Sequence, residues 1–418
     1  MIQVFCKNPS ERLKYVLDFM FNSKGEDYVI CTSESDWEKI EGIKFNYSNR
    51  MVEGDLSIEP SGFLDETEID DQLKLERVNG NLALRNSSDE LSIIFYTLSR
   101  YEEHQPYQKD EHGRFLSKFS QQYKLGILDT PFVDEIIKSI WEKLGLDYTA
   151  VLEKFQCVPS FDIDVAWAFK GRPLWRTLGG LIKSQGEGRL KVLLKKQKDP
   201  YDTYSYITSV SAKVKRIICF VLLSDWGKYD KNIHWKNEDY QSLIRGLNSS
   251  GGMGIHPGYN SHLNREVQKS EIQRLEEIVG HEVQKSRFHF LRFEMDKSYD
   301  LLIQNGIKKD YSMGYSDSSG FRAGTSFPFN YFNLKSNKTE DLLIFPFVYM
   351  DSALKDKMKF SSEESLDHVQ ELIDKTSQVG GLFMCIWHNS SVTDRGEWQG
   401  WREVLDRTID YSLSKSLQ

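Results

Sequence analysis

Two aspartates stand close together in a short apolar segment, residues 160–164 (SFDID). If the segment is a strand, Asp162 and Asp164 point to the same face, because side chains alternate along a strand. Two adjacent carboxylates repel each other, so a metal, another cation or a raised pKa must compensate one of them. A metal held by one carboxylate, with the other free to act as a general base, would meet this requirement. The alternative is a pair of acids that faces solvent or caps a helix.

Three further polar residues stand where they could complete such a site. His256 follows a short apolar run and precedes a Pro-Gly turn, so it is a candidate metal ligand on a rigid element. Arg322 lies in a loop between Gly320 and Gly324, and glycine lets the backbone approach a ligand closely. His388 closes the last apolar run of the chain. Taken singly, each of the three could equally have a structural role.

The apolar runs that precede these residues are predicted strands, and amphipathic segments lie between several of them. The predicted strands cover residues 157–163, 216–223, 254–256, 288–293, 342–350 and 381–388, and the predicted helices include 237–247, 266–279 and 362–376. Alternation of this kind predicts a parallel α/β architecture, most simply a barrel. Active sites of such barrels lie at the C-terminal ends of the strands, which is where the candidate residues stand.

The first 150 residues have a different pattern. They combine short alternating segments with a few helical ones, such as residues 89–103, where apolar residues at i, i+3, i+4 and i+7 form one helix face. We therefore expect an α/β protein in which a smaller α+β domain, residues 1–150, precedes a parallel (β/α) barrel, residues 151–418.

Composition excludes several classes of protein. The chain has 418 residues and a net charge of −8, which argues against a dedicated nucleic-acid-binding protein. No apolar run is long enough to span a bilayer, and the N-terminus lacks the pattern of a signal peptide. Five scattered cysteines argue against a disulfide scaffold and a cysteine zinc finger. We expect a soluble cytoplasmic enzyme.

One segment departs from the acidic balance. A basic insertion is predicted at about residues 168–200, and residues 170–198 carry nine basic residues against one acid. The segment is a solvated helical insertion packed on the barrel, a peripheral contact with a membrane or an anionic glycan carrier, or a contact with nucleic acid.

Taken together, the motifs resemble those of the polysaccharide deacetylases with a NodB-homology domain (carbohydrate esterase family four), in a divergent form. The resemblance covers about residues 155–410. It implies a distorted (β/α) barrel that binds one divalent metal ion, usually zinc, and removes acetyl groups from sugars. The N-terminal 150 residues lie outside it.

The resemblance assigns roles motif by motif. Segment 160–164 resembles a Thr-Phe-Asp-Asp motif, which makes Asp162 the catalytic base and Asp164 a metal ligand. Residues 256–260 (HPGYN) resemble the metal motif His-Ser/Thr-x-x-His, with His256 as a ligand. Residues 321–322 resemble the start of an Arg-x-Pro-x-Gly motif, whose arginine, here Arg322, pairs with the catalytic aspartate. Residues 386–388 resemble a Leu-x-His motif, whose histidine, here His388, protonates the leaving group.

Three more residues are expected beside the substrate. Tyr259 and Trp387 are expected to contact the sugar, together with Asp351, which stands in for the acid that tunes the catalytic histidine. A backbone N–H near residues 258–259 is expected to help hold the oxyanion.

This sequence departs from the family's pattern at the third metal ligand. Asn260 occupies the position of the second histidine of the metal motif, and an amide oxygen binds zinc more weakly than an imidazole. His289, in another predicted strand, could supply a nitrogen instead. The sequence leaves open an Asp-His-Asn site, an Asp-His-His site and the absence of a metal.

We therefore predict a metal-dependent hydrolase that removes acetyl groups, N-acetyl groups first, from a sugar or glycan precursor. The alternatives are a metal-independent cyclic-amide hydrolase of the same superfamily, a catalytically inactive glycan-binding protein and a membrane-surface adaptor that uses residues 170–198.

Overall fold

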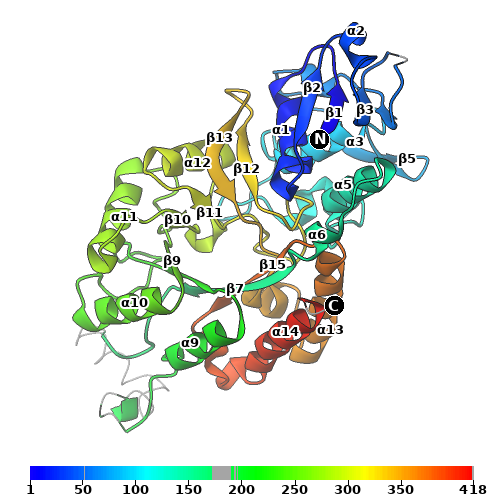
Figure 1. The fold of residues 1–418 in the computed structure, drawn as a ribbon. Helices are drawn as coiled ribbons and strands as arrows, with labels where there is room; N and C mark the ends of the chain where they lie inside the picture. Colours follow the sequence, from blue (N-terminus) through cyan, green and yellow to red (C-terminus); the bar gives the residue numbers. More distant parts are fainter. Residues whose placement is uncertain (51, 172–189, 193, 195, 417–418) are drawn as a thin grey trace.

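The computed structural model describes residues 1–418 except 51, 172–189, 193, 195 and 417–418 (Figure 1). It is a mixed α/β protein, as the strand and helix pattern predicts. The greater part of the predicted basic insertion at 168–200 lies outside the described residues. None of the described helices combines the length and the apolar composition that crossing a membrane requires.

A nine-stranded sheet forms the larger part of the molecule. Its strands pair in parallel except for the hairpin of β12 and β13. In spatial order they are β12 (Phe329–Asn333), β13 (Lys338–Ile344), β11 (Lys309–Asp310), β10 (Lys285–Ser286), β9 (Gly252–Ile255), β8 (Ile218–Val221), β7 (Gln156–Ile163), β15 (Leu382–His388) and β14 (Tyr349–Met350).

This sheet is strongly curved. β13 and β14 lie far apart in the hydrogen-bonded order, yet only residues 345–348 connect them. Those residues can span about 17 Å, whereas seven flat strand spacings would separate the two strands by about 34 Å. The sheet must therefore curl, although among the described residues β12 and β14 each pair on one side only. The distorted barrel stays a prediction.

Six helices of the described part connect or flank these strands. They are α9 (Tyr204–Lys213), α10 (Glu238–Ser250), α11 (Arg265–Val279), α12 (Met295–Gln304), α13 (Ser362–Ser377) and α14 (Trp401–Ser416). The predicted helix at 362–376 is present as α13, which begins with a capping box: Ser361 accepts a hydrogen bond from the backbone N–H of Glu364, whose side chain accepts from the N–H of Ser361.

The N-terminal part contains a four-stranded parallel sheet in the order β2-β1-β3-β4. Its elements are β1 (Ile2–Phe5), α1 (Glu11–Met20), β2 (Tyr28–Cys31), α2 (Glu34–Trp37), β3 (Ile43–Tyr47), β4 (Leu56–Ile58), β5 (Leu75–Val78), β6 (Asn81–Leu84), α3 (Glu90–Leu98), α4 (Gln121–Lys124), α5 (Phe132–Lys143) and α6 (Thr149–Leu152). The predicted helix at 89–103 is present as α3, which is capped by Asp89 and has its apolar face buried.

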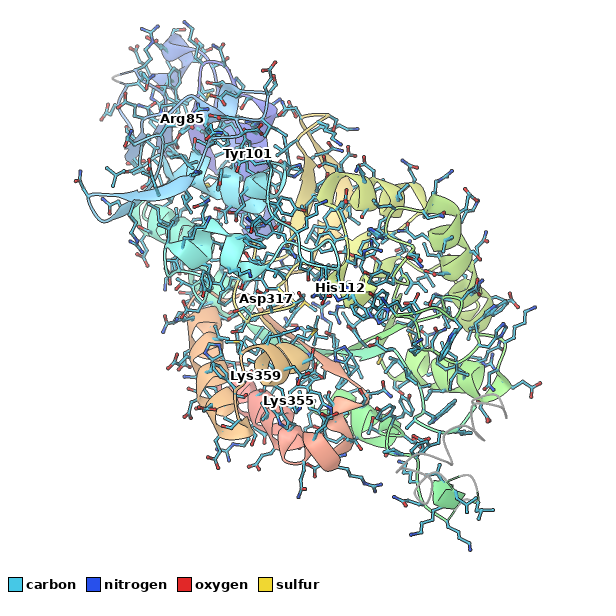
Figure 2. The ribbon with its side chains drawn as sticks, turned by 180° about the vertical axis from the view of Figure 1, so that it is seen from behind. Arg85, Tyr101, His112, Asp317, Lys355 and Lys359 are labelled. Carbon is cyan, nitrogen blue, oxygen red and sulfur yellow. The ribbon has the colours of Figure 1, made fainter. Side chains whose placement is uncertain are left out.

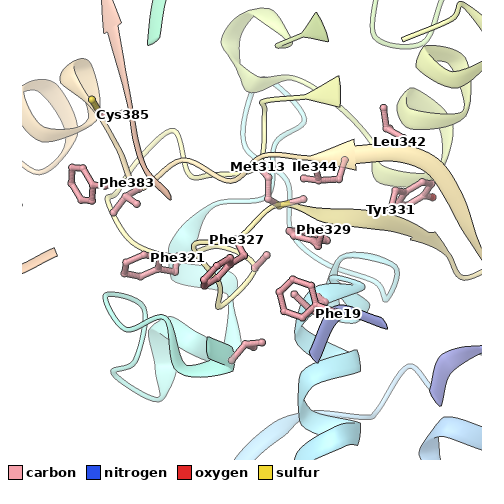
Figure 3. Close-up of a cluster of buried hydrophobic side chains, with 14 of the residues drawn as sticks. Phe19, Met313, Phe321, Phe327, Phe329, Tyr331, Leu342, Ile344, Phe383 and Cys385 are labelled. Atoms are coloured by element: carbon pink, nitrogen blue, oxygen red, sulfur yellow. The ribbon is translucent and has the colours of Figure 1, made fainter. Parts of the chain in front are cut away.

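The two parts share one hydrophobic core. A single cluster of buried side chains runs from Ile2 to Ile409. Figure 3 shows Phe19 of α1 close to the buried side chains of β12, and the rings of Phe19 and Phe329 lie 6.5 Å apart edge to face. The predicted division into residues 1–150 and 151–418 therefore does not correspond to a division of the core.

Candidate functional site

The candidate residues gather at the C-terminal edge of the large sheet. Asp162 on β7 is the Cα partner of His388 on the parallel strand β15. His256 directly follows β9, and Asp351 directly follows β14. Because parallel strands end at the same edge, these side chains meet although more than 200 residues separate the first from the last.

Asp164, His256 and His289 form a group that could hold a metal ion. Each offers one ligand atom, and these atoms lie within 4.8 Å of one another. The His256 Nε2 atom is 3.3 Å from Asp164 Oδ1, and the His289 Nε2 atom is 3.6 Å from Asp164 Oδ2. The carboxylate therefore lies between the two imidazoles.

The hydrogen bonds of both histidines fit metal binding. His256 Nδ1 lies 2.5 Å from the carbonyl oxygen of Arg287, and His289 Nδ1 lies 2.8 Å from Asp230 Oδ1. Both partners can only accept, so both Nδ1 atoms carry hydrogen. In the neutral rings Nε2 then presents a lone pair toward Asp164, whose buried Oδ1 has no hydrogen-bond partner within the described part of the chain. A cation between these atoms resolves the conflict, and a carboxylate or carbonyl behind each ligand histidine is the usual arrangement at metal sites.

The pKa values at this site reflect the same juxtaposition. Burial raises the pKa of Asp164, but His289, His256 and His388 outweigh it and hold that pKa well below its usual range. Burial lowers the pKa of His289, but Asp164 and Asp230 outweigh it and raise that pKa to about 9. Without a metal, protonated imidazole therefore supplies the positive charge that Asp164 needs.

Asp162 is buried and paired with an arginine that the sequence did not indicate. Arg287, directly after β10, donates from Nη1 to Asp162 Oδ1 at 2.7 Å and from Nη2 to Ser160 Oγ at 2.9 Å. Its Nε donates to the carbonyl of Tyr311, and its guanidinium lies 4.3 Å from the ring centre of Phe220. The position of Asp162 is therefore fixed from the side of the protein interior.

The expected pairing of Arg322 with Asp162 is wrong. Arg322 is buried away from the pocket, where its Nε donates to Glu103 Oε1 at 2.9 Å and its Nη1 to the carbonyl of Gly314. Glu103 also accepts from the buried Arg100. Burial lowers the pKa of Arg322, but Glu103 outweighs it and the net pKa is raised. Arg322 thus joins the N-terminal part to the loop before β12.

His388 stands at the end of β15 with a carboxylate behind it. Its Nδ1 lies 2.8 Å from Asp351 Oδ1, and its backbone N–H donates to Asp351 Oδ2 at 2.7 Å. Its Nε2 faces the site, 3.7 Å from Asp164 Oδ2. Burial lowers the pKa of His388, but Asp351, Asp164 and Asp162 outweigh it and raise the pKa to about 10. The ring is therefore protonated at neutral pH and can give a proton.

Several expected contacts lie elsewhere. Asn260 is exposed and lies outside the metal-binding group, and His289 stands in the third position. Trp387 is fully buried and donates to the Tyr349 hydroxyl, because it points to the opposite face of β15 from His388. Asp351 is also fully buried, so it holds His388 and does not line the pocket.

The expected oxyanion donors are already occupied. The backbone N–H of Gly258 donates to Glu271, and that of Tyr259 donates to Asp230. The Tyr259 hydroxyl lies 3.1 Å from His112 Nδ1, so this side chain packs beside the pocket wall.

A pocket of about 240 Å³ opens over these groups. Its lining includes Asp162, Asp164, His256, His289 and His388, and also the side chains of Ser316, Met350, Ser352, Lys357, His112 and Arg114. The last two come from the N-terminal part of the chain. The sequence does not indicate these two residues, because a polar turn has no hydrophobic pattern from which its position in the fold can be predicted.

Residues 2–148 match a family of unknown function, DUF7033. No curated protein matches the sequence significantly.

Solved structures match over the larger part of the chain, at low similarity. A protein assigned as a polysaccharide deacetylase from Mycobacterium smegmatis has 13% identity and a TM-score of 0.36, covering 61% of this chain and 84% of that one. One from Pseudomonas aeruginosa PAO1 has 13% identity and a TM-score of 0.40, with 62% and 85% covered. A 4-alpha-glucanotransferase from Thermococcus litoralis has 13% identity and a TM-score of 0.35, with 63% and 38% covered.

Proposed function

We propose that the protein is a metal-dependent hydrolase that removes acetyl groups, above all N-acetyl groups, from a sugar or glycan precursor. One observation carries the proposal. An Asp-His-His group with metal-binding geometry lies in one pocket with a carboxylate fixed by arginine and a histidine backed by a carboxylate. These are a ligand set, a candidate base and a candidate acid, the three parts that metal-assisted hydrolysis requires.

Asp164, His256 and His289 would hold the ion. Two imidazoles and one carboxylate suit zinc and leave coordination positions open, as in catalytic zinc sites. The bound ion would polarise the acetyl carbonyl and lower the pKa of water at the site.

Asp162 would take the proton of the attacking water. Arg287 holds this carboxylate by a hydrogen bond to Asp162 Oδ1 and a second one to the neighbouring Ser160. Asp162 lines the pocket, and its Oδ2 lies 3.9 Å from His256 Nε2. A base held in this way does not have to reorient during the reaction, which lowers the barrier.

His388 would protonate the departing nitrogen. Asp351 accepts the hydrogen on Nδ1 and so fixes the orientation of the ring. Burial lowers the pKa of His388, but Asp351 and the nearby aspartates outweigh it and raise this pKa to about 10. An amide nitrogen is a poor leaving group unless it is protonated, so an acid on this side of the pocket favours cleavage of an N-acetyl group.

Acetate release tests the proposal. The zinc-loaded protein is incubated with N-acetylglucosamine and its oligomers, and free acetate is measured enzymatically. We expect release that is lost on chelation, restored by zinc and reduced at least about 100-fold in Asp162→Asn. Release that survives chelation would instead indicate a metal-independent hydrolase. The absence of release, or equal release by Asp162→Asn, would contradict the deacetylase assignment.

A further inference from the structure

A turn in the N-terminal part forms one wall of the catalytic pocket. Asp110 builds this turn: its Oδ1 accepts from the backbone N–H groups of His112 and Arg114, and its Oδ2 accepts from the Arg114 side chain at 2.8 Å. Gly113 adopts a φ of +79°, which closes the turn. The residues on either side of Gly113, His112 and Arg114, both line the pocket.

Reciprocal hydrogen bonds join this turn to the loop that carries the ligand His289. Arg114 donates from Nη1 to the carbonyl of Phe290 at 3.0 Å, and Arg292 donates from Nε to the carbonyl of His112 at 2.9 Å. Phe290 has a φ of +61°, unfavourable for a bulky residue, so this loop needs such support. The turn is thus built into the site.

His112 is held by aromatic rings. Its ring centre lies 5.1 Å from that of Phe290, 5.4 Å from that of Tyr229 and 5.8 Å from that of Tyr259. Figure 2 shows His112 in the middle of the molecule, between the N-terminal elements and the C-terminal helices. A ring packed on three sides presents its remaining edge in a defined direction.

The remaining edge carries Nε2. Nδ1 is engaged with the Tyr259 hydroxyl, whereas Nε2 lies 3.7 Å from the carboxylate of Glu111, which is 87% exposed, and has no other polar partner among the described residues. Burial, followed by the charge of Arg114, lowers the pKa of His112, so the ring is neutral at physiological pH. A neutral ring nitrogen suits a hydroxyl or amide group better than a phosphate or carboxylate.

We propose that His112 is a substrate-contacting residue that recognises the sugar ring beyond the acetyl group, and that the 110–114 turn determines specificity. The inference rests on the proposed function and deepens it, because it assigns a role to the segment matched by the family of unknown function. The apolar side of the site is the ring of Phe290, and the polar contact is His112 Nε2.

Two substrates of different size separate this role from catalysis. 4-Nitrophenyl acetate needs only the catalytic centre, whereas tetra-N-acetylchitotetraose also reaches the pocket walls. In His112→Phe, which keeps the aromatic packing, and in His112→Ala we expect KM for the tetramer to rise about tenfold, as for one lost hydrogen bond. The loss of turnover with 4-nitrophenyl acetate should be much smaller than the loss with the tetramer, and zinc affinity should stay within about twofold. The control is His281→Ala, an exposed histidine that lies two residues beyond α11.

Binding of the tetramer in the Asp162→Asn background distinguishes the two hypotheses. If wild type releases no acetate but the added His112→Phe weakens tetramer binding about tenfold, the sugar contact stands and the deacetylase assignment fails. If His112→Phe binds the tetramer as tightly as its parent, or the parent binds none, the contact is refuted. Equal losses with both substrates, or loss of zinc in His112→Phe, would also overturn it.

Discussion

Asp164 lies among three imidazoles, those of His256, His289 and His388, each with its Nε2 atom 3.3–3.7 Å from a carboxylate oxygen. Only two of these rings belong to the metal-binding group; the third is the candidate acid. What distinguishes them is the partner behind each ring: a carbonyl for His256, and carboxylates for His289 and His388.

Zinc binding should release protons. The pKa of His289 is raised to about 9, so the ring is protonated near neutral pH and must lose a proton to bind a metal. Titration calorimetry at about pH 7.5 in buffers of different ionisation enthalpy should show about one proton released per zinc. Asn260→Ala should behave as wild type, whereas His289→Ala should lose both the release and most of the affinity. Enthalpies independent of the buffer would contradict this assignment of His289.

Arg287 should be important for stability as well as for the position of Asp162. Removing one partner of a buried ion pair leaves an uncompensated charge and costs about 3–5 kcal/mol. Arg287→Ala should therefore lower the free energy of unfolding by this amount in chemical denaturation. Arg50→Ala, which breaks an exposed pair with Glu34, should change it by less than about 1 kcal/mol. Equal effects of the two variants would show that the buried pair adds little.

At the residue scale, sequence reasoning located the residues that follow strands. Strand ends and polar residue types can both be read from the sequence. The site residues that could be predicted for this reason are Asp162, Asp164, His256 and His388. Sequence reasoning could not choose between Asn260 and His289, and it selected Arg322 where the structure places Arg287. Which arginine reaches a carboxylate depends on loop geometry, and nothing in local composition specifies that.

Two predicted strands, 288–293 and 342–350, are wrong because the secondary-structure elements end at other residues than the apolar runs suggest. Four of the six residues at 288–293 (FHFLRF) are apolar. However, β10 ends at Ser286, and the chain then turns with Phe290 and Leu291 at φ of +61° and +52°. Bulky residues give no signal for such a turn. Residues 342–350 read as one strand, but they divide between β13 and β14, which lie far apart in the sheet order.

Helix α11 supports the loop after β9 in a pH-dependent way. Glu271 on α11 accepts hydrogen bonds from the N–H of Gly258 and the hydroxyl of Ser261. Burial raises the pKa of this carboxyl and the two hydrogen bonds lower it. Burial has the larger effect, so the pKa is raised from 4.5 to about 7. The folded state therefore holds this proton more tightly than the unfolded state. Its contribution to stability is fully present below about pH 4.5 and is lost as the pH rises through about 7.

Glu271→Gln should remove this part of the pH dependence. Between about pH 4.5 and pH 7.5 the wild type should lose up to about 3 kcal/mol relative to the variant, measured as the difference in free energy of unfolding. Glu277→Gln, at an exposed position on the same helix, is the matched control and should follow wild type. A constant difference between wild type and Glu271→Gln across this range would refute the assignment.

For the whole molecule, the N-terminal part and the large sheet form one structure. The buried Asp134 of α5 accepts hydrogen bonds from Thr325 and Ser326, and the Tyr15 hydroxyl donates to the carbonyl of Asn330. Composition and periodicity change near residue 150, and the sequence therefore indicates a boundary there. Those signals report local pattern and cannot show that the same core continues across it.

Separation at this boundary should abolish folding. Residues 151–418 expressed alone would expose the apolar surfaces that α1, α3 and α5 cover, and would leave Arg322 buried without Glu103. We expect poor solubility or the absence of a cooperative thermal transition, whereas the full chain unfolds in one. A soluble 151–418 fragment with the transition temperature of the full chain would contradict a shared core.

The position of bound zinc tests the proposed metal site directly. Anomalous diffraction at the zinc edge from crystals of the zinc-loaded protein gives this position without reference to activity. We predict one strong peak within coordination distance of an Asp164 carboxylate oxygen and the Nε2 atoms of His256 and His289, and no peak at Asn260. A peak coordinated by Asn260, or no peak among these residues at full zinc loading, would contradict the metal site on which the proposed function depends.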